Sequence, residues 1–294
     1  PSGAFFAMLD SRGVLNLFDL ATGKSLSEWN AASDEIPTDR YYDYSILAND
    51  RVIAFSGSKI ICINGKDGSL VWEDAYHSLD SRFRNDGYLS EPHHALSGDE
   101  SVVAVKLLGY EETYLINTRD GSLKSLITIE DSDSLFAQMV LSGDGARLAV
   151  VYSNILSQDT KASVSVIDVQ TNSIISSFEL AYTGAFFSEF TQDGTLICGS
   201  YNYSNWDDDS GDVSMQLTCH DIEQGTVLWT SEVSAERSMF DLYISKIRLL
   251  YSEESGSHIL LTVENRVFVF DLATGVKITE MVAPSTITGS TMNV

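Results

Sequence analysis

Basic residues, cysteine, proline and long apolar runs are all scarce in this 294-residue chain, and each scarcity excludes a class of protein. Lys and Arg number 18 against 42 Asp and Glu, and the net charge of −24 argues against nucleic acid or an anionic membrane surface as the partner. Four prolines and 20 glycines exclude a collagen-like or low-complexity chain. No apolar run approaches the roughly 18 residues of a membrane span, so we expect no direct membrane insertion.

The three cysteines, Cys62, Cys198 and Cys219, do not suggest a disulfide framework, because their number is odd and small. Each lies in an alternating apolar stretch, which predicts a buried, reduced thiol. This low cysteine content favours a cytoplasmic location, with an extracytoplasmic location as the alternative. The chain begins with Pro1 and has no signal-like segment there, so we expect it to be a piece of a longer protein.

A repeated segment is the most informative feature of the sequence. Six stretches align without gaps: LFDLATG, CINGKDG, LINTRDG, VIDVQTN, CHDIEQG and VFDLATG. Their third position is always Asp or Asn, and their seventh is Gly or Asn. The pairs, spaced by 45 to 53 residues, are Asp19 and Gly23, Asn64 and Gly68, Asn117 and Gly121, Asp168 and Asn172, Asp221 and Gly225, and Asp271 and Gly275.

Each repeat is predicted to be a β-hairpin, because an alternating apolar stretch enters the turn and another leaves it. Gly or Asn at the seventh position suits a backbone with positive φ, which other residues resist. The Asp or Asn side chain at the third position is suited to accept hydrogen bonds from the turn amides that follow it.

Two further strand-like runs precede each hairpin, for example residues 135–142 and 146–153 around the turn Gly143-Asp144-Gly145. Four short strands in about 50 residues are typical of a propeller blade. We therefore predict an all-β fold: one β-propeller domain of four-stranded antiparallel blades over residues 1–294. The expected core includes Val103, Val105, Leu148, Val150, Ile197 and Leu260, and also Leu261 and Val263, the neighbours of Thr262.

Six blades are visible, and a seventh stays open, hidden in residues 74–99 or outside the chain. The first repeat lacks its opening strand. The tail, residues 286–294, follows a finished sixth hairpin and is predicted to supply that strand. The C-terminal strand would then close the ring and remove an exposed sheet edge.

The stretches FDLATGKSLSEW, INGKDGSLVWED and HDIEQGTVLWTS resemble the repeat of the quinoprotein-like, pyrroloquinoline-quinone-type β-propellers. Trp72 and Trp229 stand four residues after the turn Gly, where the resemblance implies packing between adjacent blades, and Trp29 is displaced by two. The stretches LSGDGARLAVV and FTQDGTLICGS look similar to WD40-type repeats. The quinoprotein dehydrogenases carry a quinone, Ca²⁺ and an adjacent cysteine pair, but no two cysteines are adjacent here, so the resemblance favours the non-enzymatic relatives: scaffolds, adaptors and sensor domains.

An acidic loop at residues 206–212 is one candidate site. Asp207, Asp209 and Asp212 are candidate Ca²⁺ ligands, because clustered carboxylates suit that ion. Their order does not match an EF-hand loop, and a solvated hairpin loop explains the same pattern. Trp206 beside them is a candidate partner anchor.

A long connection at residues 74–91 is the second candidate site. Arg82, Phe83, Arg84 and Tyr88 are residue types enriched at binding hot spots, and long loops on rigid scaffolds often carry function. The alternative is an elaborated connection that packs on its own blade.

Catalytic motifs are missing from the sequence. It has no Gly-x-Ser-x-Gly, no phosphate-binding loop and no zinc-ligand spacing among its five histidines. We therefore expect a non-catalytic interaction, scaffold or sensor propeller without a cofactor, whose acidic charge selects a protein partner with a basic surface. The alternative is a propeller that binds a small molecule or Ca²⁺, related to quinoproteins and possessing an enzyme activity.

Overall fold

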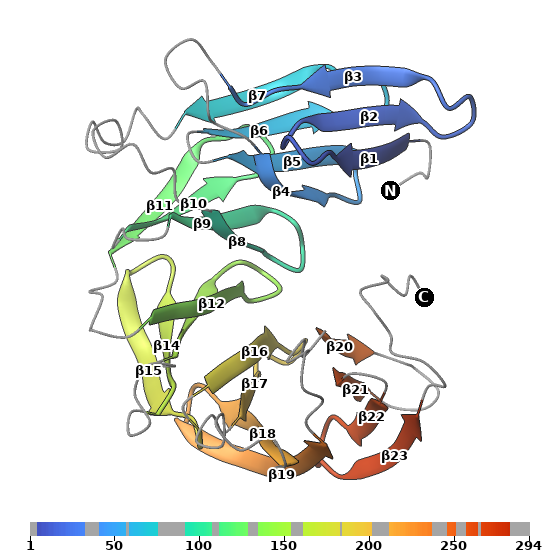
Figure 1. Cartoon of the computed structure of the whole chain (residues 1–294). Coiled ribbons are helices and arrows are strands. Elements are labelled where there is room, and N and C mark those ends of the chain that lie inside the picture. Colours follow the sequence, from blue (N-terminus) through green and yellow to red (C-terminus); the bar gives the residue numbers. More distant parts are fainter. Residues whose placement is uncertain are drawn as a thin grey trace. The chain divides into compact units, whose positions relative to one another are not determined.

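The computed structural model describes residues 5–32, 41–56, 59–75, 92–107, 112–128, 135–153, 161–182, 184–201, 212–236, 246–250, 257–263 and 266–282. These ranges contain strands and turns and no helix, and hence no helix long and apolar enough to cross a membrane. The chain divides into two compact units, Pro1–Asp131 and Ser132–Val294. Each unit contains three antiparallel sheets (Figure 1).

The first unit contains one three-stranded and two four-stranded sheets, all connected as simple meanders. The first sheet consists of β1 (Phe5–Leu9), β2 (Leu15–Asp19) and β3 (Ser25–Trp29). The second consists of β4 (Tyr41–Ile46), β5 (Arg51–Ser56), β6 (Lys59–Asn64) and β7 (Leu70–Ala75). The third consists of β8 (Pro92–Leu96), β9 (Val102–Leu107), β10 (Glu112–Asn117) and β11 (Leu123–Thr128).

The second unit contains three four-stranded sheets with the same connection. The fourth sheet consists of β12 (Leu135–Leu141), β13 (Arg147–Ser153), β14 (Ser163–Asp168) and β15 (Ser173–Glu179). The fifth consists of β16 (Gly184–Phe190), β17 (Leu196–Tyr201), β18 (Asp212–Asp221) and β19 (Thr226–Glu236). The sixth consists of β20 (Lys246–Leu250), β21 (His258–Val263), β22 (Arg266–Asp271) and β23 (Lys277–Val282).

The predicted four-stranded units are confirmed for five of the six sheets, and the strands predicted at residues 135–142 and 146–153 are β12 and β13. The first sheet has three described strands, with β1 at its edge. The tail predicted to complete it, residues 286–294, lies outside the described residues, so ring closure remains a prediction. The same holds for a single domain over residues 1–294.

The turn before each outermost strand follows the repeat pattern closely. The seventh-position residues have φ between 54° and 73°: Gly23, Gly68, Gly121, Asn172, Gly225 and Gly275. The third-position side chain accepts a hydrogen bond from a turn amide in every repeat, as from Thr22 to Asp19 (2.6 Å) and from Thr171 to Asp168 (2.7 Å). The hydroxyl and the amide of Thr22 donate to Asp19, and the amide and the hydroxyl of Thr171 donate to Asp168. Because these hydrogen bonds favour the ionised carboxylate, they hold the pKa of both aspartates below its ordinary value.

A β-bulge follows every one of these turns. The register shifts opposite the third residue after the seventh position, so that this residue is extra in its strand: Leu26, Val71, Lys124, Ile175, Leu228 and Ile278. A bulge bends a strand and interrupts strict alternation of its side chains. Two successive side chains can therefore be exposed at this place.

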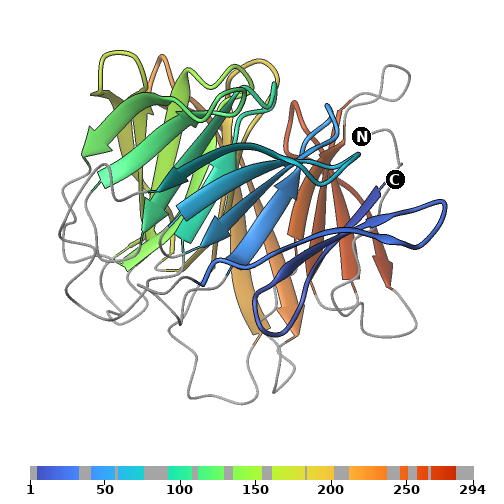
Figure 2. The ribbon, with the colours of Figure 1, turned by 90° about the horizontal axis from the view of Figure 1, so that it is seen from above.

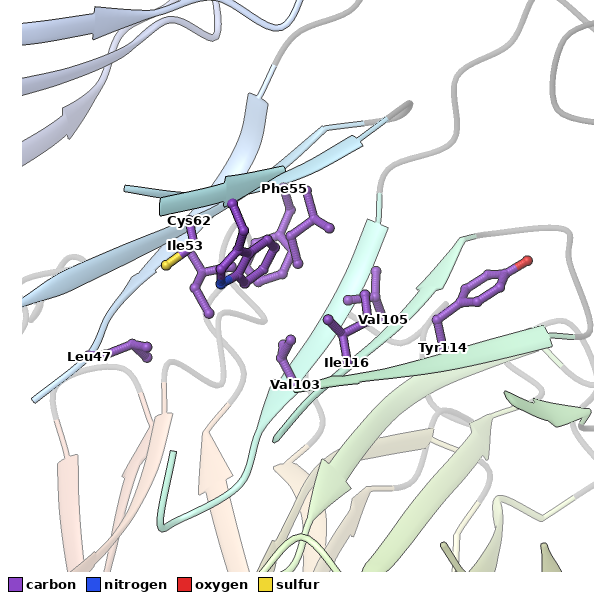
Figure 3. Packing of buried hydrophobic residues seen from close by; sticks show 10 residues of the cluster. Leu47, Ile53, Phe55, Cys62, Val103, Val105, Tyr114 and Ile116 are labelled. Atoms are coloured by element: carbon purple, nitrogen blue, oxygen red, sulfur yellow. The ribbon is translucent and has the colours of Figure 1, made fainter. Parts of the chain in front are cut away.

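Hydrophobic clusters fill the space between neighbouring sheets within each unit. Figure 3 shows the cluster of the second and third sheets, which includes Ile53, Phe55, Cys62, Val103, Val105 and Ile116. Six residues of the expected core are fully buried: Val103, Val105, Leu148, Val150, Ile197 and Leu261. The side chain of Val263 lies outside those described. Leu260 is only partly buried, because its neighbours Ile259 and Leu261 point into the core and alternation turns Leu260 to the other face.

Candidate interaction surface

Two tryptophans join neighbouring sheets through the repeated turns. Trp72 of β7 is 8% exposed, and its indole N–H donates to the carbonyl oxygen of Thr118 in the third sheet (2.9 Å). Trp229 of β19 donates in the same way to Leu272 of the sixth sheet (3.0 Å). Both acceptors occupy the fourth position of the following repeat. Each indole therefore satisfies a turn carbonyl of the next sheet.

The same indole rings lie against the turn glycines. A Cβ added to Gly121 would meet Trp72 Cδ2 at 2.8 Å, and one added to Gly275 would meet Trp229 Cδ2 at 2.6 Å. Gly68 faces Ser27 instead, because Trp29 is displaced and its N–H donates to Ser27 Oγ in its own strand (3.2 Å). Because glycine has no side chain, it allows both the positive φ and the close approach of an aromatic ring at this position.

Two histidines, the buried His220 and the partly buried His94, stack on phenylalanine rings of the preceding sheet. The His94 ring lies 4.0 Å from that of Phe55, and the His220 ring lies 3.8 Å from that of Phe178. Burial lowers the pKa of both histidines, that of His220 to about 4. Both imidazoles are therefore neutral at pH 7 and act as packing groups.

Ser45, His94 and Asp43 bring a hydroxyl, an imidazole and a carboxylate together at the innermost strands of the second and third sheets. Ser45 Oγ lies 3.3 Å from His94 Nε2, and Asp43 Oδ2 lies 4.0 Å from His94 Nδ1. An activated nucleophile needs a base that is itself held by a hydrogen bond, and 4.0 Å is too long for one. The arrangement shown suits packing between sheets better than nucleophilic catalysis.

The cysteines are free and buried, which confirms the interpretation of the sequence. Burial raises the pKa of Cys62 to about 11, and it also raises the pKa of Cys198 and Cys219. Thiols in this environment stay protonated and unreactive at neutral pH.

The predicted site residues fall mostly outside the described residues. These are Asp207, Asp209, Trp206, Arg82, Phe83, Arg84 and Tyr88. Asp212 is the first residue of β18. The described ranges contain no group of three or more His, Cys, Asp or Glu residues placed to hold a metal ion. The Ca²⁺ site and the partner-binding loop therefore remain predictions.

Exposed aliphatic residues on the outermost strands are a feature that the sequence interpretation missed. They stand at the post-turn bulge or next to it in each four-stranded sheet: Leu70, Val71, Leu123, Ile174, Ile175, Val227, Leu228 and Ile278. Exposure ranges from 38% for Val71 to 66% for Ile174. The signal was present in the repeat, since the bulge residue is aliphatic in five of six copies. Simple alternation, however, assigns one of two successive apolar residues to the core.

Protonation of His220 is expected to destabilise the fold. Its pKa is about 6.5 when unfolded and about 4 when folded, so the stability it supports is complete above pH 6.5 and is lost as the pH falls towards 4. We expect the free energy of unfolding to fall by about 3 kcal/mol over this interval through His220 alone. Urea titrations of the wild type and of His220→Phe, which keeps the ring on Phe178, should separate this term from carboxylate protonation. Equal losses in both proteins would contradict the assignment.

Comparison with known proteins supports the fold and indicates no specific function. No protein-family model and no curated protein sequence matches the chain. Among solved structures, the Dos1 propeller superposes with a TM-score of 0.64 at 12% identity, covering 96% of this chain and 69% of that one. A chain of a mitotic checkpoint complex gives a TM-score of 0.61 at 10% identity, covering 96% and 76%. The hydrazine synthase of Kuenenia stuttgartiensis gives 0.56 at 14%, covering 88% and 70%.

These likenesses and the repeated antiparallel sheets show an all-β propeller fold, and each sheet is a blade. The identities are too low to indicate what the chain binds. No finding supports the pyrroloquinoline-quinone type over the WD40 type.

Proposed function

We propose that this chain is a non-catalytic propeller module that binds a protein partner. The observation that carries the proposal is a pair of adjacent exposed aliphatic side chains at the post-turn bulge of three outermost strands: Leu70 and Val71, Ile174 and Ile175, and Val227 and Leu228. Exposed apolar groups rimmed by polar residues mark interaction surfaces in soluble proteins. The similar solved structures include a chain of a protein assembly, the mitotic checkpoint complex, which is consistent with this role and does not specify it.

The charge of the chain suggests the character of the partner. A net charge of −24 attracts basic surfaces, accelerates encounter and makes association sensitive to salt. A basic partner that also covers aliphatic side chains would retain part of its affinity at high salt. Scaffold and sensor roles share this requirement for a protein partner.

Affinity capture with the purified chain tests the proposal. We expect a specific protein partner that rebinds in purified form, with an affinity at least tenfold weaker at 500 mM salt than at 50 mM. Replacing Ile174 and Ile175 together by Ser should lower the affinity for the partner if the fourth sheet takes part in the interface. The affinity should stay unchanged if that sheet does not take part. Salt-independent binding would contradict the electrostatic component, and the absence of any partner would contradict the function.

The alternative, a propeller that binds Ca²⁺ or a small molecule, is tested by thermal melts with Ca²⁺ or quinone added. A ligand at 100 times its dissociation constant should add roughly 2.7 kcal/mol to the free energy of unfolding. A shift of that size would favour the alternative over the interaction module.

A further inference from the structure

The outer hairpin of the fifth sheet is longer than its counterparts. After its bulge, β19 stays in unbroken register with β18 over eight pairs, from Trp229 with Cys219 to Glu236 with Asp212. The corresponding stretches of the other outermost strands contain three or four pairs. Figure 2 shows this hairpin in orange beside the shorter strands. Eight residues give a straight edge of roughly 27 Å.

This edge has a strand neighbour on one side only among the described residues, since β19 ends the order β16-β17-β18-β19. Proteins protect such edges with Lys, Pro or short length. β19 reads TVLWTSEVSAE, with no Lys, Arg or Pro. Its protective features are the bulge near its start and the exposed charge of Glu232.

The exposed side chains of β19 present a mixed surface. Val227 and Leu228 are 54% and 53% exposed, and Thr230 and Glu232 are exposed as well. Thr230 and Glu232 pair with Thr218 and Gln216, so the register places them on one face. The opposite face carries Trp229, which binds the sixth sheet.

The surrounding sequence is exclusively acidic. Residues 162–236 contain twelve Asp and Glu and no Lys or Arg, so half of the net charge of −24 falls in a quarter of the chain. A bound cationic segment would offset this excess of negative charge.

We propose that the edge of β19 binds an extended, basic segment of a partner protein by strand addition. Backbone hydrogen bonds along the edge supply affinity, and Lys or Arg side chains next to Glu232 supply specificity. Apolar side chains of the segment cover Val227 and Leu228. A second copy of this chain fits poorly, because it would bring two exclusively acidic sheets together. The inference rests on the proposed function, which it makes specific.

The test uses three peptides of about ten residues, one per position of β19. The first alternates Lys and Val, the second alternates Glu and Val, and the third alternates Lys and Pro, which keeps the charge, removes every second backbone donor and restricts φ away from the extended strand. Binding to the whole chain is measured by calorimetry, and amide hydrogen exchange locates the bound peptide. The variant is Glu232→Lys, and its matched control is Glu179→Lys, which makes the same charge change at the exposed end of β15.

We expect the Lys–Val peptide to bind and to slow exchange along β19. Affinity should fall at least tenfold in Glu232→Lys and less than twofold in Glu179→Lys, while both variants keep the wild-type melting temperature. The Glu–Val and Lys–Pro peptides should not bind.

Equal binding of the Lys–Pro peptide, or equal losses in the two variants, would show diffuse charge attraction and overturn the strand-addition site. No binding of the Lys–Val peptide would overturn it too. In either case a captured protein partner that binds Glu232→Lys normally would leave the proposed function standing, so the two failures are distinguishable.

Discussion

Trp72→Ala is expected to lower the free energy of unfolding by about 3–5 kcal/mol, the range for truncating a buried aromatic side chain. The indole is 8% exposed, fills the seam between the second and third sheets, and donates to the carbonyl of Thr118. Its removal leaves both a cavity and an acceptor without its donor. The loss is measured by urea unfolding followed by far-ultraviolet circular dichroism.

Two other tryptophans serve as comparisons. Trp229→Ala removes the equivalent hydrogen bond to Leu272 in the second unit and should likewise lower the free energy of unfolding. Trp29→Ala should cost less than half as much as Trp72→Ala, because the indole of Trp29 bonds within its own strand. Equal losses for Trp29 and Trp72 would mean that the contact between sheets contributes little.

Gly275→Ala is expected to destabilise the protein by about 1–3 kcal/mol more than Gly225→Ala. Both glycines have positive φ, 69° and 64°, so both substitutions share a backbone cost of about 1–2 kcal/mol. A Cβ at Gly225 meets nothing within 4 Å, whereas one at Gly275 overlaps the ring of Trp229. Thermal or urea unfolding of the two variants measures the difference directly.

A double variant identifies the cause. If the ring is responsible, Gly275→Ala should add little further destabilisation in a Trp229→Ala background, and the two losses will not be additive. Gly225→Asn should be close to neutral, because Asn172 occupies the equivalent place with φ of 54°. Additive losses would locate the extra cost of Gly275→Ala in the backbone alone.

The positions of the hairpins were predictable from the sequence because the decisive interactions are local. Asp168 and Asn172 lie four residues apart, and the turn they form depends on hydrogen bonds and φ angles within that stretch. Alternation likewise predicted that Val103 and Val105 are buried, but it did not predict that Val102 and Ala104 between and beside them are buried too, because β9 packs on both of its faces. The repeat therefore determined the class of fold.

The bulge and its exposed side chains were not predictable from alternation. Ile175 and Leu228 each follow another apolar residue, and a strictly alternating strand would bury one residue of each such pair. Only the register shift shows that Ile175 and Leu228 are extra in their strands. The resemblance implied that Trp72 and Trp229 pack between adjacent blades, but their contacts with Gly121 and Gly275 of the next repeat join residues about 45 to 50 positions apart and follow from no local pattern. Such contacts depend on how two sheets pack.

The sequence by itself determined the repeated turns, the antiparallel hairpins, the buried thiols and the acidity of the chain, since each follows from residue type and spacing along a few neighbouring positions. Only the tertiary structure decided which side chains of the outermost strands are exposed, how the histidines became neutral packing groups, and that β19 has a long single-sided edge. The physical reason is that burial and edge position depend on neighbours brought together by folding, which no local pattern specifies.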